Sequence, residues 1–197
     1  IHINALKTSA IKHGVLIVLE DVTELSKKIS DLSVVNNFAR ILSAELELED
    51  VIKKMLTGLN EFINSDTAMV LLFKENEPNN LMLKEIIGIN KKLTPGTLYS
   101  SNFLSCLCSI EATLPLILNS PSEIEKNLGF IVDGVGYKPS QVIVHTVKFQ
   151  NSCLGSIIFL KMQNSFKGFS HELFQSLVSF CSVALENAIR YRKLKEL

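Results

Sequence analysis

Hydrophobic positions change their spacing along this chain, and the first change marks the end of a β segment. Residues 1–20 read as β structure, because the run Gly14-Val15-Leu16-Ile17-Val18-Leu19 is apolar and rich in β-branched side chains. A strand this apolar is not stable alone. We therefore expect it to belong to a sheet that lies mostly outside this chain or to pair with a neighbouring molecule.

From residue 22 to residue 46 the spacing becomes helical and predicts a helix that enters the following domain. Its apolar seam takes alternating steps of four and three residues through Leu25, Ile29, Leu32, Asn36, Ala39 and Leu46, with Ser43 at the position between the last two. An Asn at such a core position pairs with its copy in a parallel two-stranded coiled coil and fixes the register. On a single amphipathic helix the same Asn36 would face solvent, and Val34, Val35 and Phe38 widen the stripe, so both interpretations stay open.

The rest of the chain alternates between helical and strand patterns. We expect a helix over 51–63, strands at 68–73 and 81–89, a short helix at 101–111, a strand at 114–118, a helix over 122–132, strands at 142–149 and 154–162, and a long last helix that begins after Ser170. Polar turn residues at 75–80 and at 150–152 make each of the two longer strand pairs a predicted hairpin.

The last helix carries two apolar stripes. One contains Phe174, Val178, Cys181, Leu185 and Ala188 and becomes charged at Arg192, whereas the other continues to the end of the chain. One stripe can pack on a sheet while the second stays available for another helix. Together with the first helix, this predicts a homodimer interface of Leu25, Ile29, Leu32, Asn36, Leu173, Leu177, Phe180, Ala184, Tyr191 and Leu194.

The composition is that of an ordinary globular protein, with 47% hydrophobic residues, 20% charged residues and a formal net charge of zero. A neutral chain has no broad electrostatic attraction for nucleic acid or an anionic membrane, so neither is an expected partner. No apolar run approaches the ~20 residues of a membrane-spanning helix. The chain begins with Ile and no signal peptide follows, so we expect a cytoplasmic segment from inside a longer protein.

Local motifs then give the chain a family resemblance. The segment from Gly14 to Leu25, with its Asp21-Val22-Thr23, looks like the last strand and exit of a PAS domain. The hairpin of 142–149 and 152–160, with Gly155 after Leu154, and the closing helix after Phe169-Ser170-His171-Glu172 resemble the end of a GAF domain. The resemblance implies terminal strands of a PAS-like domain at 1–21, a signalling helix at 22–46, a GAF domain at 47–190, and at 191–197 the start of a linker to an absent output domain.

The fold that this resemblance implies is α+β. A central antiparallel sheet of five to six strands would carry the N- and C-terminal helices on one face and short helices or loops on the other. The function implied is a non-catalytic sensory module of a signalling protein, such as a sensor histidine kinase or a cyclic-dinucleotide enzyme, that works as a homodimer and binds an unidentified small molecule. A ligand-free spacer that only dimerises and relays a signal is the alternative.

The segments that line the ligand cavity in GAF relatives point to candidate pocket residues, although each is also a candidate for the core. They are Phe103, Cys106, Leu107, Phe130, Tyr137, His145 and Phe159. His145 shares a strand face with Ile143 and Val147, where it is either a core or pocket histidine bonded to backbone or a haem ligand.

Motifs for other chemistry are missing from the sequence. It contains no His-x-x-x-His, no Cys-x-x-Cys and no phosphate-binding glycine loop, and Cys106-x-Cys108 has poor zinc geometry, so we predict no catalytic or metal site and no particular cofactor. Neither of these cysteines precedes a histidine, as the bilin-attaching cysteine does in relatives. The four cysteines lie in apolar stretches and are expected to be buried and reduced. The GAF resemblance also implies a minor alternative, a free methionine sulfoxide reductase that uses several cysteines, although the spacing of Cys106, Cys108 and Cys153 does not match that of these relatives.

Overall fold

The computed structural model describes residues 2–6, 14–18, 23–74, 77–100, 114–166 and 170–196. The chain divides into two compact units, residues 1–34 and residues 35–197. In the first unit, strands β1 (His2–Leu6) and β2 (Gly14–Val18) pair antiparallel, with His2 opposite Val18. β1 supplies β2 with a row of backbone partners along one edge, and whether this pair belongs to a larger sheet outside the chain stays a prediction. The assignment of this segment to a PAS-like domain stays a prediction.

Helix α1 (Thr23–Ser43) is confirmed as one continuous helix, and the boundary between the two units falls within it. Its last part belongs to the second unit and buries Phe38 and Leu42. The preceding turns expose the seam residues Leu25, Ile29 and Leu32. The helix therefore has one end anchored by apolar contacts and one end whose apolar side chains are not covered by any of the described residues.

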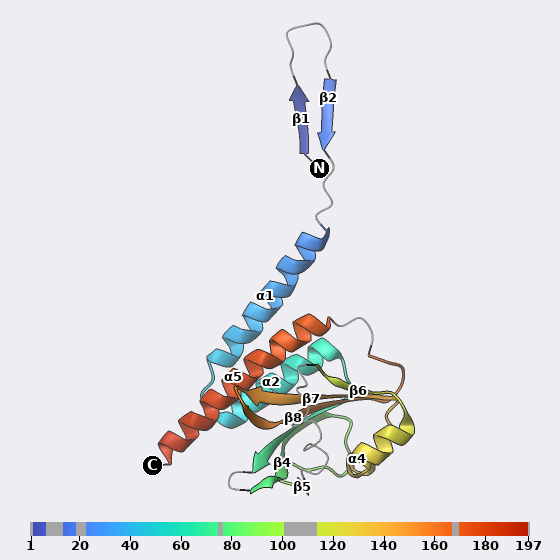
Figure 1. The fold of residues 1–197 in the computed structure, drawn as a ribbon, viewed down its shortest axis with the longest axis vertical. Coiled ribbons are helices and arrows are strands. Elements are labelled where there is room, and N and C mark those ends of the chain that lie inside the picture. Colours follow the sequence, from blue (N-terminus) through green and yellow to red (C-terminus); the bar gives the residue numbers. More distant parts are fainter. Residues whose placement is uncertain are drawn as a thin grey trace. The chain divides into compact units, whose positions relative to one another are not determined.

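The second unit is built on a six-stranded sheet in the order β5-β4-β3-β8-β7-β6, in which all neighbours are antiparallel. The strands are β3 (Thr67–Lys74), β4 (Glu77–Gly88), β5 (Leu98–Ser100), β6 (Leu116–Leu118), β7 (Gln141–Phe149) and β8 (Ser152–Lys161). Both predicted hairpins are confirmed. Helices α2 (Leu48–Ile63) and α5 (His171–Lys195) cover one face, and α4 (Pro121–Val135) lies on the other (Figure 1).

Each sheet face has its own hydrophobic core, because side chains of successive strand residues point to opposite faces. On the face of α2 and α5, Val70, Ile143 and Ile157 pack against helix residues such as Met55 and Leu185. On the face of α4 the core consists of Met69, Leu71, Leu81, Leu83, Leu93, Leu118, Ile124, Leu128, Ile131, Val132, Val135, Val142, Val144, Ile158 and Leu160. The predicted α+β class, with terminal helices on one face, is confirmed.

Helix ends follow local chemistry. Asn64 takes a left-handed conformation with φ of 56° and ends α2, donating its backbone N–H to the carbonyl of Asn60. At the start of α5, the hydroxyl of Ser170 accepts a hydrogen bond from the backbone N–H of Leu173. Both boundaries were predicted from sequence. Among the described helices, none combines the length and apolar character needed to cross a membrane.

The structure differs from the predicted elements in three places. Strand β4 starts at Glu77, inside the predicted turn, where Glu77 pairs with Lys74 and accepts from the amide of Asn80. Helix α4 runs on to Val135, with a break in helical geometry at Leu128. The short strand β5 was not predicted, and the predicted helix at 101–111 lies outside the described residues.

Candidate functional site

The predicted pocket residues do not share one cavity. Phe103, Cys106 and Leu107 lie outside the described residues. His145 and Phe159 face α5, where their rings lie 5.4 and 5.8 Å from the ring of Phe174. Phe130 and Tyr137 lie on the side of α4, the opposite face of the sheet. The structure therefore places these four residues on two faces of the sheet, and the role of each in ligand binding stays a prediction.

Tyr137 and Phe130 make structural contacts on the α4 side. The hydroxyl of Tyr137 donates to Oγ1 of the fully buried Thr67, 2.8 Å away, and Thr67 in turn donates to the carbonyl of Ile89. Burial raises the pKa of Tyr137, so the phenol stays protonated and keeps its donor role. The half-exposed Phe130 stacks at a tilt on Tyr99, with 4.9 Å between ring centroids.

The α4 face also holds a buried polar atom. Ser156 is fully buried on β8, opposite Thr146 of β7 and Leu71 of β3 in the sheet register. Its hydroxyl oxygen has no hydrogen-bond partner within the described structure. Burying a hydroxyl without a hydrogen-bond partner costs on the order of 1–3 kcal/mol of folding free energy, so a ligand that hydrogen-bonds to the Ser156 hydroxyl would remove this cost.

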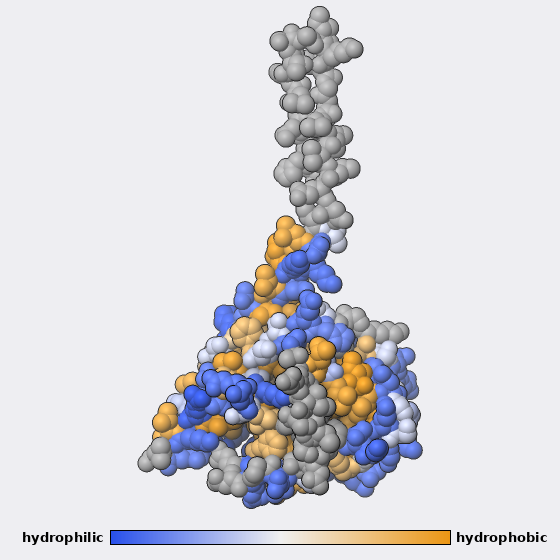
Figure 2. All heavy atoms as spheres, in the orientation of Figure 1, coloured by the Kyte–Doolittle hydropathy of each residue, from blue (hydrophilic) through white to orange (hydrophobic). Residues whose placement is uncertain are grey.

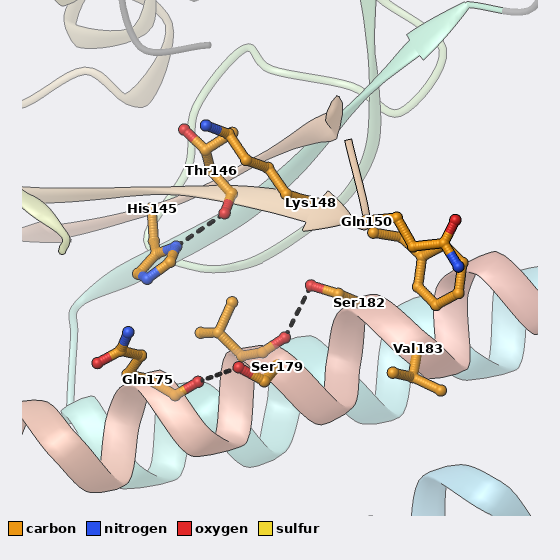
Figure 3. A pocket seen from close by; sticks show the side chains of 10 residues that line it. His145, Thr146, Lys148, Gln150, Gln175, Ser179, Ser182 and Val183 are labelled. Carbon is orange, nitrogen blue, oxygen red and sulfur yellow. Dashed lines mark hydrogen bonds between the residues drawn. The ribbon is translucent and has the colours of Figure 1, made fainter. Parts of the chain in front are cut away.

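A groove of about 440 Å³ lies on the other face, between the end of β7 and helix α5. Figure 3 shows the His145 ring reaching from β7 toward α5, above Gln175 and Ser179. The walls also include Val178, Ser182 and Val183 of the helix. Alternation along β7 gives His145 this position, because it is two residues from Ile143 and from Val147, which belong to the same core.

His145 has an unusual hydrogen-bonding state. Its side chain is 6% exposed, and Nδ1 lies 2.9 Å from the carbonyl oxygen of Thr146. A carbonyl oxygen only accepts, so Nδ1 carries the proton and Nε2 carries a lone pair. Nε2 is buried and has no partner within the described residues. Burial lowers the pKa of His145, the bond to Thr146 opposes this, and the charge of Lys148 lowers it further. The imidazole is therefore a neutral acceptor.

A second hollow, of about 650 Å³, lies where the turns of the two hairpins meet the end of α5. Its lining is rich in basic side chains, but acids already neutralise several of them. Arg190 pairs with Glu186, and Arg192 pairs with Glu49 and Glu196. Much of the positive charge around this hollow is therefore paired with acids of the same chain. Across the parts of the chain that the structure describes, no three His, Cys, Asp or Glu side chains gather as metal ligands would.

The predicted dimer residues divide into exposed and buried sets. Leu25, Ile29, Leu32, Asn36, Phe180 and Leu194 are exposed, and Ala184 and Tyr191 are half-buried. Figure 2 shows hydrophobic atoms on α1 next to hydrophilic ones. Leu173 and Leu177, in contrast, belong to the core of the domain. They are corrected as interface residues, because α5 packs on both the sheet and α2, which needs a wider apolar stripe than the sheet alone.

Comparison with known proteins decides the fold. The structure matches the GAF domain of an Acinetobacter phosphoenolpyruvate-protein phosphotransferase with a TM-score of 0.66 at 14% identity, over 84% of this chain and 96% of that one. The fold is that of a GAF domain. The GAF domain of a putative sensor histidine kinase from Pseudomonas syringae pv. tomato matches with a TM-score of 0.54 at 14% identity, over 88% of this chain and 96% of that one.

A third solved structure extends the GAF likeness to a domain named for its ligand. The chromophore-binding domain of a bacteriophytochrome from R. palustris matches with a TM-score of 0.62 at 10% identity, over 98% of this chain and 70% of that one. No protein-family model and no curated protein matches the sequence. The likeness thus lies in the fold, and the functional argument has to come from the residues of this chain.

Proposed function

We propose that this chain is a non-catalytic sensory or regulatory GAF module that pairs with a second copy through α1 and the exposed side of α5. One observation carries the proposal: Leu25, Ile29 and Leu32, spaced as a coiled-coil seam on a single helix, are each about 60% exposed. Large aliphatic side chains at this spacing favour a second helix as cover. Asn36 is the next seam position and is exposed too, as the register-setting pair of a parallel dimer requires.

The relay follows from what the two helices contact. α5 packs on β7 and on α2 within the same core, while Leu194, near its end, is exposed. A small molecule held over the sheet would change the position of α5 only through a difference in its affinity for two arrangements. The names of relatives with this fold, a sensor histidine kinase and a chromophore-binding domain among them, support a sensory role.

Sedimentation velocity tests the pairing. In the chain with Ile29→Glu, a charge replaces a seam residue, and we expect the dimer to dissociate at least ten-fold more readily, because each copy buries the carboxylate. Val34→Glu is the matched control, since Val34 is an exposed β-branched residue of the same helix that lies off the seam. A strictly monomeric parent chain, or equal weakening by both variants, would refute the proposed pairing.

The position of the ligand is tested separately. The unpartnered Ser156 oxygen makes the α4 face the favoured side for a polar group of the sensed molecule. Native mass spectrometry of protein purified from its host would detect a co-purifying molecule, and absorbance above the protein band would reveal haem, flavin or bilin. Ser156→Ala should weaken retention of that molecule without altering the dimer.

The ligand-free spacer has an observation in its favour. The described residues of the α4 face are packed as a core, with Met69, Leu71 and Ile158 fully covered. If the purified dimer carries no small molecule and Ser156→Ala raises its stability, the spacer is the better account. The reductase alternative depends on Cys106 and Cys108, which lie outside the described residues, and on the half-buried Cys153. It stays a prediction that turnover of free methionine sulfoxide would test.

A further inference from the structure

We propose that the groove between β7 and α5 is a binding site for a small neutral molecule that presents N–H or O–H donors, with Nε2 of His145 as the principal acceptor. This site lies on the opposite face of the sheet from Ser156. It goes beyond the proposed function, because binding here needs neither a second copy of the chain nor a relay.

Three of the side chains that line the groove, those of His145, Ser179 and Ser182, offer hydrogen-bond acceptors. The hydroxyl of Ser179 donates its single hydrogen to the carbonyl of Gln175, at 2.8 Å, and that of Ser182 donates to the carbonyl of Val178, at 2.9 Å (Figure 3). Both oxygens keep only lone pairs. Nδ1 of His145 likewise donates its hydrogen to the carbonyl of Thr146. In each of these three side chains the hydrogen is therefore already donated, and only a lone pair is left to face a ligand. A ligand that satisfies them must bring the hydrogens.

Charge and shape narrow the class of ligand further. Lys148 lines the groove and lowers the pKa of His145, so a cation meets a like charge there. Phe149, Val178 and Val183 give the walls an apolar part that suits an aromatic or aliphatic body. The volume of about 440 Å³ lies in the range of small-molecule sites, roughly 300–1,000 Å³. The ligand class is therefore a neutral, largely apolar molecule with a donor group, such as a primary amide.

Access to Nε2 depends on Gln175. Nε2 has less than 1 Å² of exposed surface, and the half-buried side chain of Gln175 lies below the ring in Figure 3. The side-chain amide of Gln175 forms no hydrogen bond within the described residues, so a rotamer change costs little beyond entropy. Rotation of Gln175 would open the path from the groove to the imidazole.

The test uses benzamide as the probe and nitrogen-15 NMR of the histidine-labelled chain as the readout. Benzamide should bind in the millimolar range and shift the Nε2 resonance of His145 in the direction of an accepted hydrogen bond. N,N-dimethylbenzamide has the same ring without N–H groups and should bind at least about five-fold more weakly, the value of one neutral hydrogen bond. Benzamidinium, which adds a positive charge, should bind more weakly as well.

Variants locate the site. Ser179→Ala should weaken benzamide binding about three- to ten-fold, because it removes one acceptor. Ser176→Ala is its matched control, since the Ser176 hydroxyl also donates to a helix carbonyl but is exposed outside the groove. His145→Phe, whose fold is checked by circular dichroism, should abolish the difference between benzamide and its dimethyl analogue.

Three results would overturn the proposal. The first is no displacement of the His145 resonance by benzamide up to its solubility limit. The second is equal affinity for the two amides, which would leave only an apolar depression. The third is a resonance that shows Nε2 already hydrogen-bonded in the free protein and no longer so in Gln175→Leu. In that case the amide of Gln175 would be the donor, and no ligand would be needed. None of these outcomes bears on the dimer, so the proposed function stands or falls separately.

Discussion

Replacing Leu42 with alanine should destabilise the domain far more than the same change at Leu32, although both leucines lie on α1. Leu42 is 1% exposed and belongs to the core shared by α2 and α5, whereas Leu32 is 62% exposed. Truncating a buried leucine costs the transfer free energy of three carbons plus that of the cavity left behind, about 2–5 kcal/mol. Near the middle of this range, about 3 kcal/mol, the ratio of folded to unfolded protein falls on the order of a hundred-fold.

Urea unfolding followed by circular dichroism measures this difference. At low protein concentration, pairing of two chains adds little to the measured stability. The loss of unfolding free energy in each variant therefore measures contacts within one copy of the chain. With a slope of ~1–3 kcal/mol/M, a loss of about 3 kcal/mol should lower the Leu42→Ala midpoint by about 1–3 M at an unchanged slope. Leu32→Ala should shift the free energy of unfolding by no more than about 0.5 kcal/mol.

Two outcomes would refute the reasoning. If Leu42→Ala were as stable as the parent chain, the end of α1 would not be anchored in the core. If Leu32→Ala cost as much as Leu42→Ala at low concentration, the exposed seam would be covered within one chain. Raising the concentration separates the two effects, since only a loss at Leu32 should then grow.

The remaining predictions concern a buried base, a glycine and a helix cap. Burial lowers the pKa of His145 from its ordinary value of 6.5, so the stability that the neutral ring contributes is complete above pH 6.5 and is lost as the pH falls toward the lowered pKa. A plot of unfolding free energy against pH should therefore be flatter over this range in His145→Phe. Gly88→Ala, at φ of +88°, places a Cβ 2.1 Å from the carbonyl oxygen of Asp66, and thermal melts should show a loss of about 1–3 kcal/mol of stability. Gly96→Ala is the control and should cost less, because Gly96 has φ of +93° but open space around its Cβ position. Ser170→Ala removes the cap of α5 and should cost about 1 kcal/mol in urea unfolding, with restoration by Ser170→Asp and no recovery by Ser170→Val.

Local chemistry let the sequence alone determine most element types and several boundaries. The hydroxyl of Ser170 and the left-handed tolerance of Asn64 act within one helical turn, so their effect can be read without knowing the fold. Period-two alternation likewise predicted the strands of both hairpins and placed His145 on the same strand face as Ile143. The GAF order of elements followed from these local signals.

Only the tertiary structure decided which face each element covers, because that depends on contacts between residues far apart in sequence. It put His145 and Phe159 against α5, and Phe130 and Tyr137 on the other side of the sheet. It also made α5 bury Leu177 as well as Phe174, since the helix contacts both the sheet and α2. The lone pair of His145 is the clearest case: sequence supplies an imidazole, but only packing leaves one nitrogen bonded and the other buried without a partner.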